Sequence, residues 1–134
     1  MTLEQIKARY MAYLDALLHP EKFPEVIADN FLAHDLPAWM TLLAFRKRVL
    51  KTLTGQDFEV LHLIAEGNLV FAQLRAKGTH EGEFSGIAPT GKLITFEIFD
   101  IVRFDDDGKA AERWSLVDWV SFYRQIGMTE IPQR

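Results

Sequence analysis

The chain has 134 residues, a length that suits a single domain built around one hydrophobic core. It contains no cysteine, which excludes disulfides, thiolate nucleophiles and cysteine-ligated metals. Its net charge of −4 argues against nucleic acid as a partner, and no apolar run approaches the roughly 18 residues of a membrane span. We therefore expect a cytoplasmic protein with one domain over residues 1–134 and with neither nucleic acid nor membrane as a partner.

The first half of the chain has the apolar spacing of helices, with steps of three and four residues from Leu3 to Leu17. Thr2 and Gln5 fit a capping box at the start of this helix, and Pro20 ends it. A short second helix is predicted from Pro24 over the sequence PEVIADNF. A third helix is predicted from about Ala38 to Leu53, with Gly55 as its C-terminal cap. Its predicted buried side consists of Trp39, Leu42, Leu43, Val49, Leu50 and Leu53.

From Phe58 the apolar period changes to two, which is typical of strands. Further strands are predicted over residues 69–77, 93–104 and 111–120, and the sequence DDDGK forms a hairpin turn between the last two. We interpret the run Asp105–Asp107 as a solvated turn and not as a calcium site. Helices followed by long strands predict an α+β fold, in which helices cover one face of a curved antiparallel sheet. Such a cone, open at one end, suits a small-molecule pocket.

Alternation sorts the third predicted strand into two faces. Asp100 shares a face with Phe96 and four other apolar residues, so this face is expected to be the covered one. A carboxylate there is costly unless it is paired, and Arg103 and Arg75 are the possible partners. The opposite face is mixed, and together with Phe99, Ile101 and Trp119 it would expose much apolar surface. We therefore predict a homodimer.

The remaining candidate residues are His80, His34, Trp114 and Asp118. Strict alternation places His80 on the face opposite to Arg75, but a bulge at Gly78 would bring both side chains into the cone. Trp114 and Asp118 share one face of the last strand. Each has a simpler interpretation as well: a core tryptophan, an aspartate that caps a helix, and, for His34, a histidine that bonds a backbone carbonyl.

A longer motif connects these residues. It comprises Thr79, His80, Gly82, Phe84, Gly86, Pro89, Thr90 and Gly91, followed by Asp100, Arg103, Phe104, Gly108, Lys109, Glu112, Trp114 and Asp118. With this motif the C-terminal half resembles the SnoaL-like polyketide cyclase family of the nuclear transport factor 2-like superfamily.

The resemblance implies a cone-shaped α+β barrel that forms a homodimer and uses no metal or organic cofactor. It also implies ring closure on a polyketide-like compound by intramolecular aldol condensation, with Asp118 as general acid/base and His80 in the pocket. We expect Trp114, Asp100, Arg75, His34 and Phe96 to complete the pocket. An aspartate in an apolar cavity suits this chemistry because burial raises its pKa toward neutrality.

Two alternatives remain open on the same fold. One is a non-catalytic protein that binds a small apolar ligand, and the other is an isomerase or epoxide hydrolase. Epoxide hydrolysis on this fold uses an Asp-Arg-Asp arrangement, in which Arg75 could supply the arginine. However, Lys77 stands where the second acid would be needed.

Overall fold

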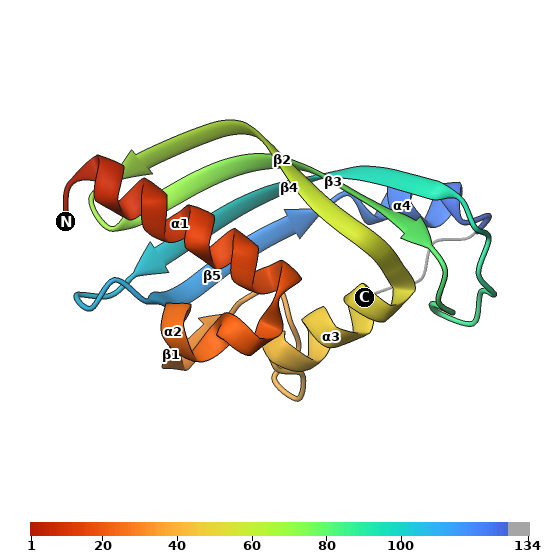
Figure 1. Cartoon of the computed structure of the whole chain (residues 1–134), viewed down its shortest axis with the longest axis horizontal. Coiled ribbons are helices and arrows are strands. Elements are labelled where there is room, and N and C mark those ends of the chain that lie inside the picture. Colours follow the sequence, from red (N-terminus) through yellow and green to blue (C-terminus); the bar gives the residue numbers. More distant parts are fainter. Residues whose placement is uncertain (129–134) are drawn as a thin grey trace.

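The computed structural model describes residues 1–128, and it has the predicted α+β fold (Figure 1). The helices are α1 (Leu3–Leu18), the 3₁₀ turn η1 (Pro20–Lys22), α2 (Phe23–Val26), α3 (Leu42–Thr52) and α4 (Trp119–Gln125). The strands are β1 (Ile27–Ala33), β2 (Leu53–Glu66), β3 (Leu69–His80), β4 (Leu93–Phe104) and β5 (Ala110–Val117). The domain predicted over residues 1–134 includes residues 129–134, which lie outside the described part. Among residues 1–128, no helix is both long and apolar enough to cross a membrane.

The five strands form one curved sheet in the order β1-β5-β4-β3-β2 (Figure 1). Neighbours from β2 to β5 are antiparallel, as predicted, but β1 pairs parallel with β5, so the sheet is mixed. The helix predicted from Pro24 is therefore wrong beyond Val26. The segment that follows instead supplies backbone partners to the free edge of β5, as the bond from His34 N–H to the Arg113 carbonyl at 2.9 Å illustrates.

Helix α1 lies across one face of the sheet and buries its apolar stripe there (Figure 1). The predicted capping box is confirmed: Thr2 Oγ1 accepts the Gln5 N–H, and Gln5 Oε1 accepts the Thr2 N–H. The buried stripe consists of Ile6, Tyr10, Tyr13, Leu14, Ala16 and Leu17. Two of these residues, Tyr10 and Tyr13, carry hydroxyls into the interior, where they need polar partners.

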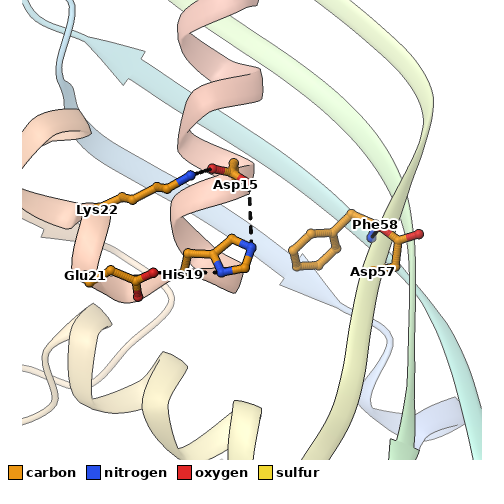
Figure 2. Close-up of polar contacts among 6 residues, drawn as sticks. All are labelled: Asp15, His19, Glu21, Lys22, Asp57 and Phe58. Carbon is orange, nitrogen blue, oxygen red and sulfur yellow. Dashed lines mark hydrogen bonds and ion pairs between the residues drawn. The ribbon is translucent and has the colours of Figure 1, made fainter.

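Charged side chains fix the corner between α1 and η1 (Figure 2). Lys22 Nζ donates to Asp15 Oδ2 at 2.6 Å, and this bond lowers the pKa of Asp15. His19 lies 3.8 Å from Asp15 and 3.9 Å from Glu21. All four side chains are about half exposed or more. Exposed ion pairs contribute little to the free energy of folding, so the main effect of these pairs is to fix the direction of the chain at this corner.

Strand residues alternate between an inner face, covered by the helices, and an exposed outer face. On β2 the ring of Phe58 points toward the helices and Asp57 points away (Figure 2). On β4 the predicted inner set is confirmed, because Asp100 is buried with its apolar neighbours, while Phe99 is 46% and Ile101 is 37% exposed.

Helix α3 begins at Leu42, four residues later than predicted. Thr41 is its N-cap and accepts the Ala44 N–H at 3.1 Å. Trp39 was expected on the buried side, but it precedes the helix and is 79% exposed. Leu43 is also exposed, because it lies on the solvent side of the helix.

At its other end, α3 runs directly into β2, so the prediction of Gly55 as a helix cap is wrong. Gly55 lies within β2 with a φ of 61°, at a point where the register with β3 shifts between Thr54 and Asp57. This bulge lies in β2, and β3 itself pairs with β4 without interruption through Gly78. Gly78 is needed for another reason: a Cβ there would lie 2.8 Å from the Leu53 Cβ.

The connection between β3 and β4 is held against the end of α3. The Thr52 carbonyl accepts the N–H groups of both Glu81 and Gly82. A Cβ at Gly82 would lie 2.2 Å from the Lys51 carbonyl oxygen, so this close approach requires glycine.

The same connection contains a tight turn that positions an aromatic side chain. Phe84 and Ile87 exchange both backbone hydrogen bonds, at 3.1 and 2.9 Å. Between them, Ser85 and Gly86 have φ values of 53° and 82°, the pattern of a type I′ turn. The turn buries Phe84, whose ring stacks on Trp119 of α4 at 6.2 Å.

Candidate functional site: a cavity with a buried Asp–Arg network

A cavity of about 40 Å³ lies between the helices and the inner face of the sheet, enough space for two or three water molecules. Its apolar wall comes from Leu17, Phe45, Val49, Phe58, Leu74, Phe84, Phe96, Ile98, Val117, Trp119 and Phe122. Its polar lining comes from Arg46, Thr52, Gln56, Asp100, Arg113 and Ser115. A few polar groups that converge in an apolar cavity form the arrangement expected of a small-molecule site.

Arg113 of β5 is the central charge of this cavity. Its Nε and Nη2 donate to the two carboxylate oxygens of Asp35 at 2.9 and 2.5 Å, and its Nη1 donates to the Tyr13 hydroxyl at 3.1 Å. The side chains of Arg113 and Asp35 are only 5% and 9% exposed. Burial opposes the charge of Arg113, but Tyr13, Asp35 and Asp100 together raise its pKa above the ordinary value. Arg113 is therefore a permanently charged group with a fixed orientation.

Asp100 of β4 is the carboxylate of the cavity. Tyr10 donates its hydroxyl proton to Asp100 Oδ2 at 2.8 Å, whereas Oδ1 is buried and has no hydrogen-bond partner within residues 1–128. Burial raises the pKa of Asp100, and the charge of Arg113 offsets this only in part. Ser115 lies opposite Asp100 in the strand ladder, and its hydroxyl also acts to lower the pKa of this carboxyl group. Asp100 thus combines a raised pKa with an unused oxygen atom.

Arg46 of α3 is a second buried cation in the cavity wall. Its Nε donates to the Leu17 carbonyl at 3.0 Å, and its Nη2 donates to Gln56 Oε1 at 2.8 Å. Burial lowers the pKa of Arg46 to about 10, and the charge of Arg113 acts in the same direction. Arg46 has no acidic partner within 4.0 Å among residues 1–128, so its charge is balanced only by neutral hydrogen-bond acceptors.

Two of the residues predicted to form the pocket, Asp100 and Phe96, line the cavity. Arg75 does not, and its predicted position is wrong. Because β3 has no bulge, Arg75 stays on the outer face, where it lies 3.4 Å from Glu59 and 4.0 Å from Glu97. Neither it nor Arg103 pairs with Asp100.

His80 is on the inner face, but it does not line the cavity. Plain alternation along β3 turns it inward, so the bulge proposed at Gly78 is neither present nor needed. His80 is fully buried at the end of the strand, where its Nδ1 accepts the Thr90 N–H at 3.2 Å and lies 3.0 Å from the Thr90 hydroxyl. His80 thus ties the β3–β4 connection to the sheet.

Trp114 and His34 do not line this cavity, although His34 lines an open groove next to it. Trp114 is 38% exposed and stacks on His34 at 4.8 Å. His34 Nε2 lies 2.6 Å from Glu112 Oε2, and this contact, followed by the bond from Arg103, lowers the pKa of Glu112. Trp114 faces outward because its neighbour Arg113 faces inward.

Asp118 does not line the cavity either. Its side chain is exposed and accepts the Ser121 N–H at 3.1 Å, so it caps the N-terminus of α4, a helix that the strand prediction over residues 111–120 missed. The simpler interpretation of Asp118 as a cap describes its geometry. Its role in catalysis stays a prediction.

Sequence analysis missed most of the polar network: Tyr10, Tyr13, Asp35, Arg46 and Arg113. The two tyrosines belong to the helical spacing between Leu3 and Leu17, and their hydroxyls were the available signal, because a buried hydroxyl needs a partner. Arg113 was assigned to one face of the last strand, opposite Trp114. The wrong face was then chosen as the inner one.

No metal ligand set accompanies this network. Within residues 1–128, no three histidine or acidic side chains are placed to hold a metal ion together. Among the described residues that line the cavity, Asp100 can exchange a proton and Arg113 carries a fixed positive charge.

Comparison with known proteins agrees with this architecture. Residues 7–126 match the family model for the SnoaL-like polyketide cyclases. The chain belongs to this family. No curated protein matches this SnoaL-like domain significantly in sequence.

Solved structures with the same fold include several proteins from Streptomyces. AclR from Streptomyces galilaeus, a candidate hydroxylase, is 21% identical with a TM-score of 0.84, over 98% of this chain and 87% of AclR. TsrD from Streptomyces laurentii is 19% identical with a TM-score of 0.81, over 95% and 98% of the two chains. A SnoaL-like polyketide cyclase from Agrobacterium tumefaciens is 25% identical with a TM-score of 0.72, over 95% and 99%. Because these identities are low, the likeness supports the fold more than a particular reaction.

Proposed function

We propose that this SnoaL-like domain is a cofactor-independent acid/base enzyme that closes a ring on a small, largely apolar carbonyl compound by intramolecular aldol condensation. The observation that carries the proposal is Asp100, which lines the cavity, has a pKa raised by burial and keeps Oδ1 without a partner in residues 1–128. A carboxyl group in such surroundings can take up and return a proton near neutral pH.

Two of the charged groups that line the cavity, Asp100 and Arg113, fit the two halves of this reaction. Ionised Asp100 removes a proton from the carbon next to the substrate carbonyl, and the electrons of that C–H bond move through a new C=C bond onto the carbonyl oxygen. The charge of Arg113, held in place by Asp35, stabilises the resulting enolate. The enolate carbon then bonds to a second carbonyl carbon of the same molecule, whose oxygen takes the proton from Asp100. The proton count balances, and the step needs no oxidant or reductant.

The test compares two aspartates. The assay follows, by NMR in D₂O, the exchange of deuterium into the carbon next to the carbonyl of 1-tetralone, a bicyclic ketone. Asp100→Asn should lower the enzymatic exchange rate about 10²- to 10⁴-fold. Asp118→Asn should leave it nearly unchanged, because asparagine is an equally good helix cap. If Asp118→Asn abolishes exchange and Asp100→Asn does not, the proposed role of Asp100 is wrong and the role implied for Asp118 by the family resemblance stands.

A second function, non-catalytic binding of an apolar ligand, is favoured by the mostly apolar wall of the cavity. At about 40 Å³ it admits a bicyclic ring only if wall residues move. Binding of 1-tetralone without any exchange above the rate in buffer would favour this function over catalysis.

A further inference from the structure

An open groove of about 660 Å³ lies outside the cavity, on the far side of a shared aromatic wall. Three residues, Phe45, Phe84 and Trp119, line both the cavity and the groove. The rest of its lining comes from the segment before α3, where the carboxylate of Asp35 is engaged by Arg113, and from Arg48, Ser85 and Tyr123. A molecule too large for the cavity could therefore occupy the groove, with one end against this shared wall.

The groove is suited to a flat, unsaturated ligand. Trp39 borders it and is 79% exposed, an unusual exposure for the largest apolar side chain. Three further lining rings contact one another: Phe84 stacks on Trp119 at 6.2 Å, and Tyr123 is tilted against both at 6.0 Å. Stacked rings offer a planar ligand a rigid surface at little entropic cost.

Arg48 places an unused positive charge at the rim of this groove. Its guanidinium lies over the Phe84 ring at 4.6 Å, and within residues 1–128 it makes no hydrogen bond and has no carboxylate within 4.0 Å. The nearby Glu83 does not pair with it, because its carboxylate accepts the Gly86 N–H of the turn. In contrast, Arg46, one half-turn earlier on α3, has its donors engaged by Leu17 and Gln56.

We infer that the groove binds a planar aromatic acid, with the rings between Trp39 and the Phe84–Trp119 wall and the carboxylate on Arg48. A guanidinium presents paired N–H donors in a plane that matches a carboxylate, and its position over Phe84 fixes that plane. The hydroxyls of Ser85 and Tyr123, 3.2 Å apart on the same rim, offer a further polar contact. The inference rests on the proposed function in that it names the class of substrate that would bind next to the cavity, but binding itself requires no catalysis.

The test uses two probes of nearly equal shape, 2-naphthoate and the neutral 2-naphthamide, with affinities measured by calorimetry. The wild-type protein should bind 2-naphthoate about tenfold more tightly than 2-naphthamide, as expected for one partly exposed charged pair. Arg48→Met should remove this preference by weakening only the acid. Trp39→Ala should weaken both probes by a similar factor.

Lys47→Met is the matched control, because it removes the same charge from the neighbouring position of α3, which does not line the groove. It should keep the preference for the acid. Equal binding of the two probes to the wild-type protein, or a preference that survives Arg48→Met, would overturn the inference. Absence of binding by both probes would overturn it as well. Loss of deuterium exchange in Asp100→Asn would still support the proposed reaction in each of these cases, so the two ideas fail separately.

Discussion

The ion pair between Asp35 and Arg113 should be a major determinant of stability, and its removal one side at a time should be costly. The two side chains are 9% and 5% exposed and are joined by two parallel hydrogen bonds of 2.9 and 2.5 Å. Asp35→Asn keeps the shape but leaves a buried, unpaired guanidinium, so we expect a loss of about 3–5 kcal/mol in the free energy of unfolding. At roughly 4 °C per kcal/mol for a domain of this size, the melting temperature should fall by about 12–20 °C.

Arg113→Met should destabilise by a similar amount, because it leaves the Asp35 carboxylate and the Tyr13 hydroxyl without their partner. The double variant Asp35→Leu/Arg113→Met replaces the pair with apolar groups and should be more stable than either single variant. Urea denaturation followed by circular dichroism at pH 7 measures all three values. Arg103→Met, which removes a half-exposed arginine paired with Glu112, is the control and should shift the curve far less. The reasoning would be refuted if the double variant lost as much free energy of unfolding as the two single variants together. It would also be refuted if each single variant lost less than about 1 kcal/mol.

Three further predictions concern other parts of the fold. Burial raises the pKa of Asp100 above 3.8, so the native state keeps this proton to higher pH than the unfolded chain, and stability should fall as pH rises from 3.8 through the raised pKa. The variant Asp100→Asn should not show this fall in stability. If the stability–pH curves of the wild-type protein and the variant are parallel, the prediction is contradicted. Gly82→Ala should destabilise by about 3 kcal/mol or more because its Cβ would lie 2.2 Å from a carbonyl oxygen, whereas Gly86→Ala, in open space with positive φ, should cost about 1 kcal/mol in the same urea titration. Finally, we expect the outer sheet face to form a homodimer around the exposed Phe99; sedimentation should detect dimers that Phe99→Glu dissociates, and a wild-type monomer at micromolar concentration would contradict this.

Local pattern was sufficient to predict the parts of the fold that depend on neighbouring residues. The capping box at Thr2, the bounds of β4 and the inward position of Asp100 all follow from spacing within one element. The segment that forms β1 was misassigned as a helix because it lacks clear alternation, and its strand conformation depends on pairing with β5, far along the chain.

The polar site was harder to predict, for a related reason. Arginine is rarely buried and tryptophan often is, so the face with Trp114 was taken as the inner one. Arg113 is buried because Asp35 pairs with its guanidinium, which offsets the cost of removing the charge from water. Asp35 is 78 residues away from Arg113 in sequence, so the pair forms only in the folded chain. A partner at that separation leaves no signal in the local pattern.

The parallel pairing of β1 with β5 also has a consequence for how the chain folds during synthesis. Ile27 pairs with Ala110, so β1 leaves the ribosome about 80 residues before its partner strand. At roughly 5–20 residues per second, this segment waits about 4–16 s with its backbone groups unpaired, while β2, β3 and β4 can already assemble as hairpins. An unpaired strand edge invites association with other chains, and nascent protein is most exposed to it during this interval. A slower translating host should therefore yield more aggregate from this chain, unless a chaperone covers residues 27–33.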